Sequence, residues 1–208
     1  MRKMMAVLPL VFVLALAAGC SKPPQDAINA ANAAVDAAKA AGAADYAPDA
    51  LTAVDNAKAA LDAELKAQEG KFALFRSYKH AEELTADLKS KADQASTAAK
   101  AGKEQAKNDA TTAIADATTA LNDAKAKLEK APKGKGTAAD LEAMKSDLTA
   151  AESKITEAQT AMQGEKFKDA KAQAEAAKTT IQGVSSQVDA AMEAKKAAAH
   201  PAHAAKKK

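Results

Sequence analysis

The chain has 208 residues, of which 61 are alanine, and it contains no Trp, two Tyr and four Phe. Its 30 basic and 27 acidic residues give a net charge of +3, and this balance of interspersed signs excludes the basic surface of a nucleic-acid-binding protein. Eight Gly and six Pro exclude a collagen-like chain, the scarcity of aromatic and β-branched residues argues against sheets, and one cysteine excludes a disulfide framework or a cysteine-based metal cluster.

The first twenty residues are typical of an exported protein. Met1-Arg2-Lys3 is basic, and residues 4–16 form an apolar run that is shorter than the roughly twenty residues of a membrane-spanning helix. The run ends in Leu16-Ala17-Ala18-Gly19-Cys20, which resembles the bacterial lipoprotein signal. The resemblance implies a signal peptide over residues 1–19, lipidation (palmitate) of Cys20, and an anchor and spacer over residues 20–24. The alternative is an ordinary signal peptide with an incidental cysteine.

Five helices are expected after the spacer. Apolar residues recur at three- and four-residue steps, Pro48 is a favoured first-turn residue, and glycines mark the ends near Gly42 and Gly70. Thr137-Ala138-Ala139-Asp140 resembles a capping box that opens a helix after the Pro-Gly loop 131–136. The expected helices cover residues 25–41, 48–69, 71–130, 137–163 and 165–194.

An internal repeat organises these helices. Residues 27–40 match residues 113–126 at a constant offset, and Leu51, Ala53 and Val54 match Leu141, Ala143 and Met144. Glu69-Gly70-Lys71-Phe72 echoes Gly164-Glu165-Lys166-Phe167 at the next turn. Within residues 71–130 the apolar stripe changes phase near Gly102 through successive four-residue steps, as at a coiled-coil stutter.

The predicted fold is therefore all-α, an elongated antiparallel helical bundle or coiled coil in which two tandem three-helix units share one long helix. We expect the first helical unit over residues 25–100, the second over residues 101–194, and a disordered basic tail over residues 195–208. The segment Gly42-Ala43-Ala44-Asp45-Tyr46-Ala47-Pro48-Asp49-Ala50-Leu51 resembles the signature of an alanine-rich helical domain of unknown function that is common in bacterial envelope lipoproteins. That resemblance implies an envelope setting and no assigned chemistry.

The residues that could carry chemistry are better explained by structural roles. Because alanine buries little area, we expect no large apolar pocket, and so no enzyme and no cofactor. His80 is expected on a solvated helix face, and the His200/His203 pair is a poor metal site because Pro201 disrupts a helix there. Phe72, Phe75 and Tyr78 are expected on one helical face that thickens the end of the bundle, or that forms a ligand-binding end.

Charge separates the body of the chain from its tail. Residues 20–194 hold 23 basic and 27 acidic residues, whereas residues 195–208 hold five lysines and no acid. Such a tail could contact anionic cell-wall polymer or lipopolysaccharide, or serve only as a solubilising end. The candidate polyanion contacts are Lys195, Lys196, Lys206, Lys207 and Lys208.

Three hypotheses on function follow. The first is a non-enzymatic spacer, tether or scaffold that a lipid anchors to the membrane, with Ser21 after the cysteine favouring the outer membrane and a periplasmic location. The second is an adaptor that binds an envelope protein partner through its helical faces. The third is a desiccation or stress protein of the Ala/Lys/Glu-rich kind, which is disordered until dried.

Overall fold

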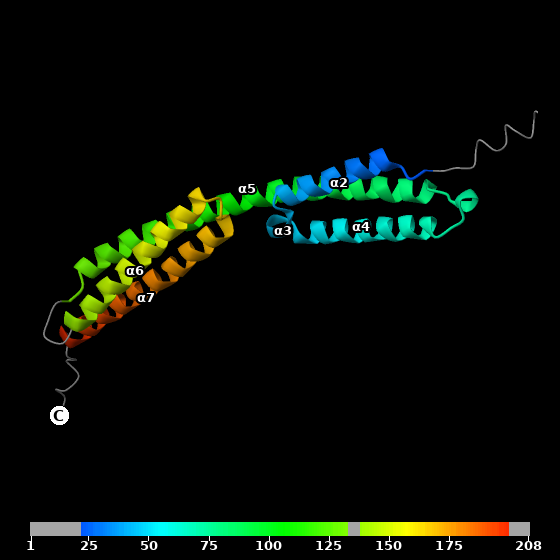
Figure 1. Cartoon of the computed structure of the whole chain (residues 1–208). Coiled ribbons are helices and arrows are strands. Elements are labelled where there is room, and N and C mark those ends of the chain that lie inside the picture. The colour runs from blue at the N-terminus through cyan, green and yellow to red at the C-terminus, as the bar shows by residue number, and fades with distance from the viewer. Residues whose placement is uncertain (1–21, 133–137, 200–208) are drawn as a thin grey trace, which may run out of the picture. The chain divides into compact units, whose positions relative to one another are not determined.

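The computed structural model describes residues 22–132 and 138–199, and in these residues it is all-α, with no strand. The signal-peptide residues, Cys20 and residues 200–208 lie outside this part of the chain. The chain divides into two compact units, residues 1–103 and residues 104–208. Helix α5, Lys79–Glu129, contributes its first part to unit 1 and its second part to unit 2 (Figure 1).

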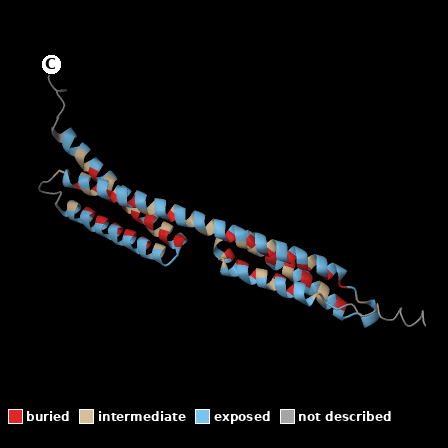
Figure 2. Cartoon of the chain, turned by 90° about the horizontal axis from the view of Figure 1, so that it is seen from above, coloured by how far each residue is buried: buried red, intermediate tan, exposed pale blue. Residues whose placement is uncertain are grey.

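Unit 1 contains α2 (Gln25–Ala40), the short helix α3 (Ala43–Tyr46), α4 (Pro48–Glu69), a 3₁₀ turn (Ala73–Phe75) and the start of α5. Its core is a seam of mostly small side chains on the facing sides of the helices (Figure 2). Large residues are few in this seam, and they include Val54, Leu61 and Leu88, each at most 1% exposed. Helix formation therefore depends on alanine's high helix propensity together with a narrow apolar stripe.

The turn between α2 and α4 packs closely against α5. Gly42 has φ +84°, a left-handed conformation that glycine adopts at no steric cost. The turn then places the backbone of Tyr46 directly against Gly102 of α5, where an added Cβ would overlap the Tyr46 carbonyl oxygen and lie 3.3 Å from the carbonyl carbon. The expected loop before Pro48 is thus a helical turn, and Gly102 is a contact point inside a continuous helix.

Unit 2 contains the rest of α5, α6 (Ala138–Gln163) and α7 (Phe167–Ala199). Its core again alternates alanine with a few larger residues, such as Leu148, Ile155 and Ile181. The α6–α7 turn is short because the Lys166 N–H donates to the Ala161 carbonyl at 2.9 Å and the Glu165 N–H to the Met162 carbonyl at 3.1 Å. This is the Schellman pattern, with Glu165 at the left-handed position, φ 57°.

The two units bury equivalent positions. Two series of buried residues have the same spacing. The first, in α5 and just before it, is Tyr78, Ala81, Thr85, Leu88, Ala92, Ala95 and Ala99. The second, in α7, is Phe167, Ala170, Ala174, Ala177, Ile181, Val184 and Val188. Tyr78 therefore corresponds to Phe167. The sequence echo that pairs Phe72 with Phe167 is wrong, because Phe72 is 70% exposed and Phe167 is 5% exposed.

Two boundary predictions need correction. The long helix begins at Lys79, not at residue 71, because residues 70–78 form the loop and 3₁₀ turn that connect α4 to α5. Helix α7 continues to Ala199, so Lys195 and Lys196 are helical, not part of a disordered tail. Alanine and lysine have high helix propensity, which extends α7 beyond its last buried residue, Val188.

Candidate functional site

The sequence-predicted site residues fall mostly outside the described residues. Cys20, Lys206, Lys207 and Lys208 lie there, as do His200 and His203. Lys195 and Lys196 lie in the last turns of α7 and are exposed. Cations near a helix C-terminus are favoured by the helix dipole, so these two lysines have a local structural role in addition to the electrostatic one predicted for them.

His80 lies exposed in the first turn of α5. Its Nδ1 atom is 3.4 Å from the Glu83 Oε2 atom, and both side chains are more than half exposed. No serine or cysteine takes part in this pair, and the prediction that His80 occupies a solvated helix position is confirmed. Among the described residues there is no group of three or more His, Cys, Asp or Glu side chains that could hold a metal ion.

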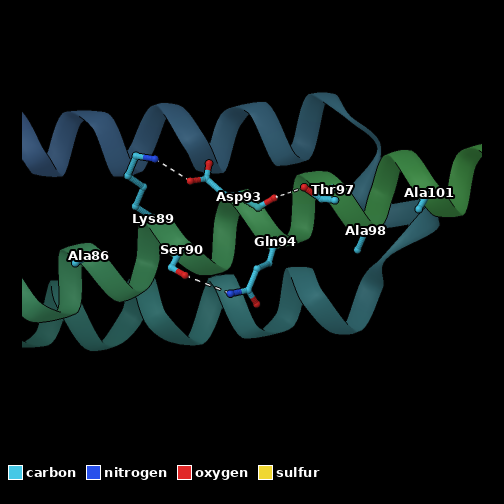
Figure 3. Close-up of a pocket in the computed structure, with 8 residues that line it drawn as sticks. All are labelled: Ala86, Lys89, Ser90, Asp93, Gln94, Thr97, Ala98 and Ala101. Atoms are coloured by element: carbon cyan, nitrogen blue, oxygen red, sulfur yellow. Dashed lines mark hydrogen bonds and ion pairs between the residues drawn. The ribbon is translucent and has the colours of Figure 1, made fainter.

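A shallow hollow lies along the outer face of α5 in unit 1 (Figure 3). All its lining residues come from this one helix: Ala86, Lys89, Ser90, Asp93, Gln94, Thr97, Ala98 and Ala101. Its polar groups bond one another, with Lys89 Nζ donating to Asp93 Oδ2 at 2.7 Å and Gln94 Nε2 donating to Ser90 Oγ at 3.2 Å. The hollow therefore presents to a partner small side chains and polar groups that already bond one another.

A ladder of ion pairs joins α5 to α7 in unit 2. Lys171, Lys178 and Lys127 each place Nζ within 2.8–2.9 Å of a carboxylate oxygen, on Asp109, Asp116 and Asp189 respectively. The hydrogen bond from Lys171, with a second from Gln105, lowers the pKa of Asp109, and the bond to Asp109 raises the pKa of Lys171. The same offset along both helices in all three pairs means that the ladder fixes their register, as e/g pairs do in coiled coils.

The loop between α4 and α5, which we name the apolar loop (residues 70–78), departs most from the sequence prediction. Phe72 and Phe75 do not share a helical face with Tyr78 or thicken the bundle, because they are 70% and 75% exposed, whereas Tyr78 is 4% exposed. Leu74 between them is 63% exposed. The ring centroids of Phe72 and Phe75 lie 6.3 Å apart. The sequence analysis noticed these aromatic residues but missed their exposure, because it expected a continuous helix from residue 71, which would place Phe72, Phe75 and Tyr78 on one face.

The segment of residues 42–51 has a packing role in this chain. Its Gly42 supplies the left-handed turn, Ala43 and Ala47 are buried, and Pro48 begins α4. Its Tyr46 contacts Gly102. These residues therefore hold α2, α4 and α5 together.

In the part of the chain that the structure describes, no helix is both long enough and apolar enough to cross a membrane. Comparison of the chain with family models, with curated proteins and with solved structures finds no match.

Proposed function

We propose that this chain is a non-enzymatic protein of the bacterial cell envelope, anchored in the outer membrane by lipid on Cys20, and that it acts as a helical spacer or tether in the periplasm. The observation that carries the proposal is the basic start, the apolar run 4–16 and the Leu16-Ala17-Ala18-Gly19-Cys20 segment that follows it. Acyl chains contribute about 0.8 kcal/mol per buried CH₂, so several chains on one cysteine anchor a protein firmly.

The surface chemistry of the described residues supports a spacer more than an enzyme. The ladder between α5 and α7 pairs its charges with each other, and the hollow on α5 satisfies its own polar groups. Paired charges of this kind keep a helical surface soluble and fix its register without activating any group for reaction. The elongated arrangement of two tandem three-helix units, expected from the sequence, is part of this proposal.

The lysine-rich C-terminal segment provides the second contact of the tether. Lys195 and Lys196 lie exposed on α7, and Lys206, Lys207 and Lys208 follow in the sequence. Residues 195–208 hold five lysines and no acid, and such a segment attracts cell-wall polymer or lipopolysaccharide, both of which are polyanions. Such contacts act over a Debye length of about 8–10 Å and weaken as salt increases.

Cell fractionation without detergent tests the anchor. The Cys20→Ser protein should move from the membrane fraction to the soluble fraction, because the proposal gives the mature chain no other membrane anchor of comparable strength. Persistence of the Cys20→Ser protein in the membrane pellet, at the wild-type level, would show that lipid on Cys20 is not the anchor.

A variant with glutamine at all five lysine positions tests the second contact while it preserves the length of the chain and of α7. Full-length protein should sediment with isolated cell wall or lipopolysaccharide at low salt and release at a few hundred millimolar salt. The glutamine variant should lose this sedimentation with unchanged helicity. Equal sedimentation of the two proteins would show that these lysines do not make the contact.

The hollow on α5 favours a second candidate function, an adaptor that binds an envelope protein through this face. Its small side chains, including Ala86, Ser90 and Ala98, would allow another helix to approach closely. Cross-linking with mass spectrometry in intact cells separates the two functions. Cross-links from residues near the hollow to one protein favour the adaptor, and cross-links confined to wall or lipid favour the tether.

A further inference from the structure

The exposed large hydrophobic residues of the described chain fall within four positions. They are Phe72, Leu74 and Phe75, all in the apolar loop, and each is at least 63% exposed. Single exposed apolar residues are normal on a protein surface, but three large ones together mark a surface that contacts something apolar. The cores of this chain consist mostly of alanine, so the exposure of three of its largest side chains to water is unusual.

The fold does not require this exposure. The stretch from the last buried residue of one helix to the first buried position of the next has almost the same length in both units. It runs from Gln68 to Tyr78 in unit 1 and from Ala158 to Phe167 in unit 2. Unit 2 uses that length to extend α6 and make a three-residue turn, 164–166, which exposes no large apolar side chain. Unit 1 uses it for a nine-residue loop, 70–78.

The apolar loop is held in shape by its own polar groups. Arg76 Nε donates to the Lys71 carbonyl oxygen at 3.0 Å, and Arg76 Nη2 donates to the Glu69 carbonyl oxygen at 2.9 Å. The Ser77 N–H donates to Oε1 of the buried Gln68 at 3.0 Å, and the Phe75 N–H donates to the Phe72 carbonyl at 2.9 Å. A loop with internally satisfied backbone groups presents apolar side chains to a nonaqueous surface at low cost.

The apolar loop lies at the end of unit 1 where the chain enters from its N-terminal side. Helix α2 starts at the same end as this loop, and the α3 turn lies at the other end (Figures 1 and 2). Because α2 is six residues shorter than α4, its start falls about 9 Å short of the loop end. The five residues 20–24 span up to about 17 Å when extended, so an anchor on Cys20 reaches the level of the loop.

The charge around the loop suits an anionic bilayer. Residues 70–79 include Lys71, Arg76 and Lys79 and no acidic residue, and the nearest acids on either side are Glu69 and Glu82. Basic residues flanking exposed Phe and Leu side chains are the usual composition of segments that lie in the membrane interface.

We propose that Phe72, Leu74 and Phe75 insert into the surface of the membrane that carries the Cys20 anchor, and that they form a second membrane contact of unit 1. The inference rests on the proposed lipid anchor, which brings this end of unit 1 to the bilayer. A lipid on a five-residue spacer leaves the protein free to turn, whereas an added contact at the apolar loop restrains unit 1, because linkage makes the second contact intramolecular.

An environment-sensitive fluorophore on the thiol of Leu74→Cys tests the proposal. The full-length lipidated protein is purified from membranes and reconstituted into vesicles of phosphatidylethanolamine and phosphatidylglycerol. The matched control carries the fluorophore at Gln163→Cys, an exposed position at the end of α6 in unit 2. We expect blue-shifted emission at position 74 and quenching by nitroxide-labelled lipid, neither at position 163, and loss of both when Phe72→Ser and Phe75→Ser are added.

Three results would overturn the inference. An emission maximum at position 74 equal to that at position 163, without quenching, means that the loop stays in water. A blue shift that grows with protein density in the vesicles, but without lipid quenching, means that the loop packs against a second copy of the chain. Retention of shift and quenching in the double serine variant, with unchanged helicity, means that these side chains are not the contact.

Vesicle flotation separates this inference from the proposed anchor. Wild-type protein that floats while Cys20→Ser does not, together with a probe at position 74 in water, leaves the anchor intact and rejects the loop contact. If Cys20→Ser still floats, and loses flotation only when Phe72→Ser and Phe75→Ser are added, the loop contact holds and lipid on Cys20 is not required for membrane binding.

Discussion

Single residues decide how closely these helices pack, and Gly102 is the clearest case. The sequence marks it as an interruption in a helical pattern, yet α5 continues through it. Its lack of a side chain admits the backbone of Tyr46, which lies 56 residues earlier in the chain. Periodicity along one helix does not reveal such a contact, because the contact depends on where another segment of the chain arrives. The exposure of Phe72 and Phe75 was missed for the same reason.

Two glycine-to-alanine substitutions in α5 and α7 should have opposite effects. Gly102→Ala should lower the free energy of unfolding by about 1–3 kcal/mol, because the new methyl group overlaps the Tyr46 carbonyl. Gly183→Ala should raise it by about 1 kcal/mol, because a Cβ there meets nothing within 4 Å and alanine is the better helix former. Denaturant unfolding measures both. A Gly102→Ala protein as stable as Gly183→Ala would show that the Tyr46 contact is loose.

Elements in this protein are joined by narrow seams, and the sequence predicts those seams well. The stripes that include Ile28, Val35, Leu148 and Ile181 were expected from three- and four-residue spacing, and these residues are buried. The ends of the elements were less predictable. Helix α5 begins only after a loop that Arg76 and Gln68 hold through hydrogen bonds, and α7 extends beyond its last buried residue. The spacing of apolar residues predicts neither the start of α5 nor the end of α7.

Because alanine seams bury little area, the few large residues should dominate stability. Leu148→Ala and Ile181→Ala remove side chains that are 2% and 1% exposed, and each should cost about 2–5 kcal/mol. That is a large share of the 5–15 kcal/mol usual for a domain. Thermal and denaturant unfolding measure the loss. Unchanged midpoints in both variants would mean that the seams contribute little to the fold.

The Asp109–Lys171 pair should make unit 2 sensitive to acid. The pKa of Asp109 is lowered from 3.8, so its stabilisation is present above that value and is lost as the pH falls through the lower folded-state pKa. The pKa of Lys171 is raised from 10.5, so its stabilisation is lost only as the pH rises through the higher folded-state pKa. Between these limits the pair is intact.

We therefore expect Asp109→Asn to lower the thermal midpoint slightly at neutral pH, and the difference from wild type to shrink as the pH falls through the lowered folded-state pKa of Asp109. Asp147→Asn is the matched control, because Asp147 is exposed and its substitution should leave the midpoint unchanged. A difference between wild type and Asp109→Asn that is as large in acid as at neutral pH would contradict the assignment.

At the scale of the whole molecule, the proposed tether assigns a different contact to each end of the chain. In this proposal lipid on Cys20 attaches one end to the membrane, two helical units follow, and the lysine-rich segment attaches the other end to polyanion. The all-α class was predictable from composition and spacing, since alanine-rich sequence with regular apolar stripes leaves few alternatives. The proposed function rests mainly on the first twenty residues of the sequence, because the paired charges of the described helices indicate no particular partner or reaction.

Far-ultraviolet circular dichroism in dilute buffer distinguishes this account from a stress protein that folds only on drying. We expect high helicity without added osmolyte and a cooperative thermal transition, because regular seams of Val, Leu and Ile stabilise both units. Low helicity that rises only on dehydration would favour the stress protein instead.

The most direct test of the central claim is the intact mass of the protein extracted from bacterial membranes. The account predicts a mature chain that begins at Cys20 and carries the added mass of acyl chains, removable from the N-terminal peptide by cleavage of ester bonds. A membrane-derived chain with an unmodified Cys20 thiol, or one cleaved at another position, would contradict a lipid-anchored tether.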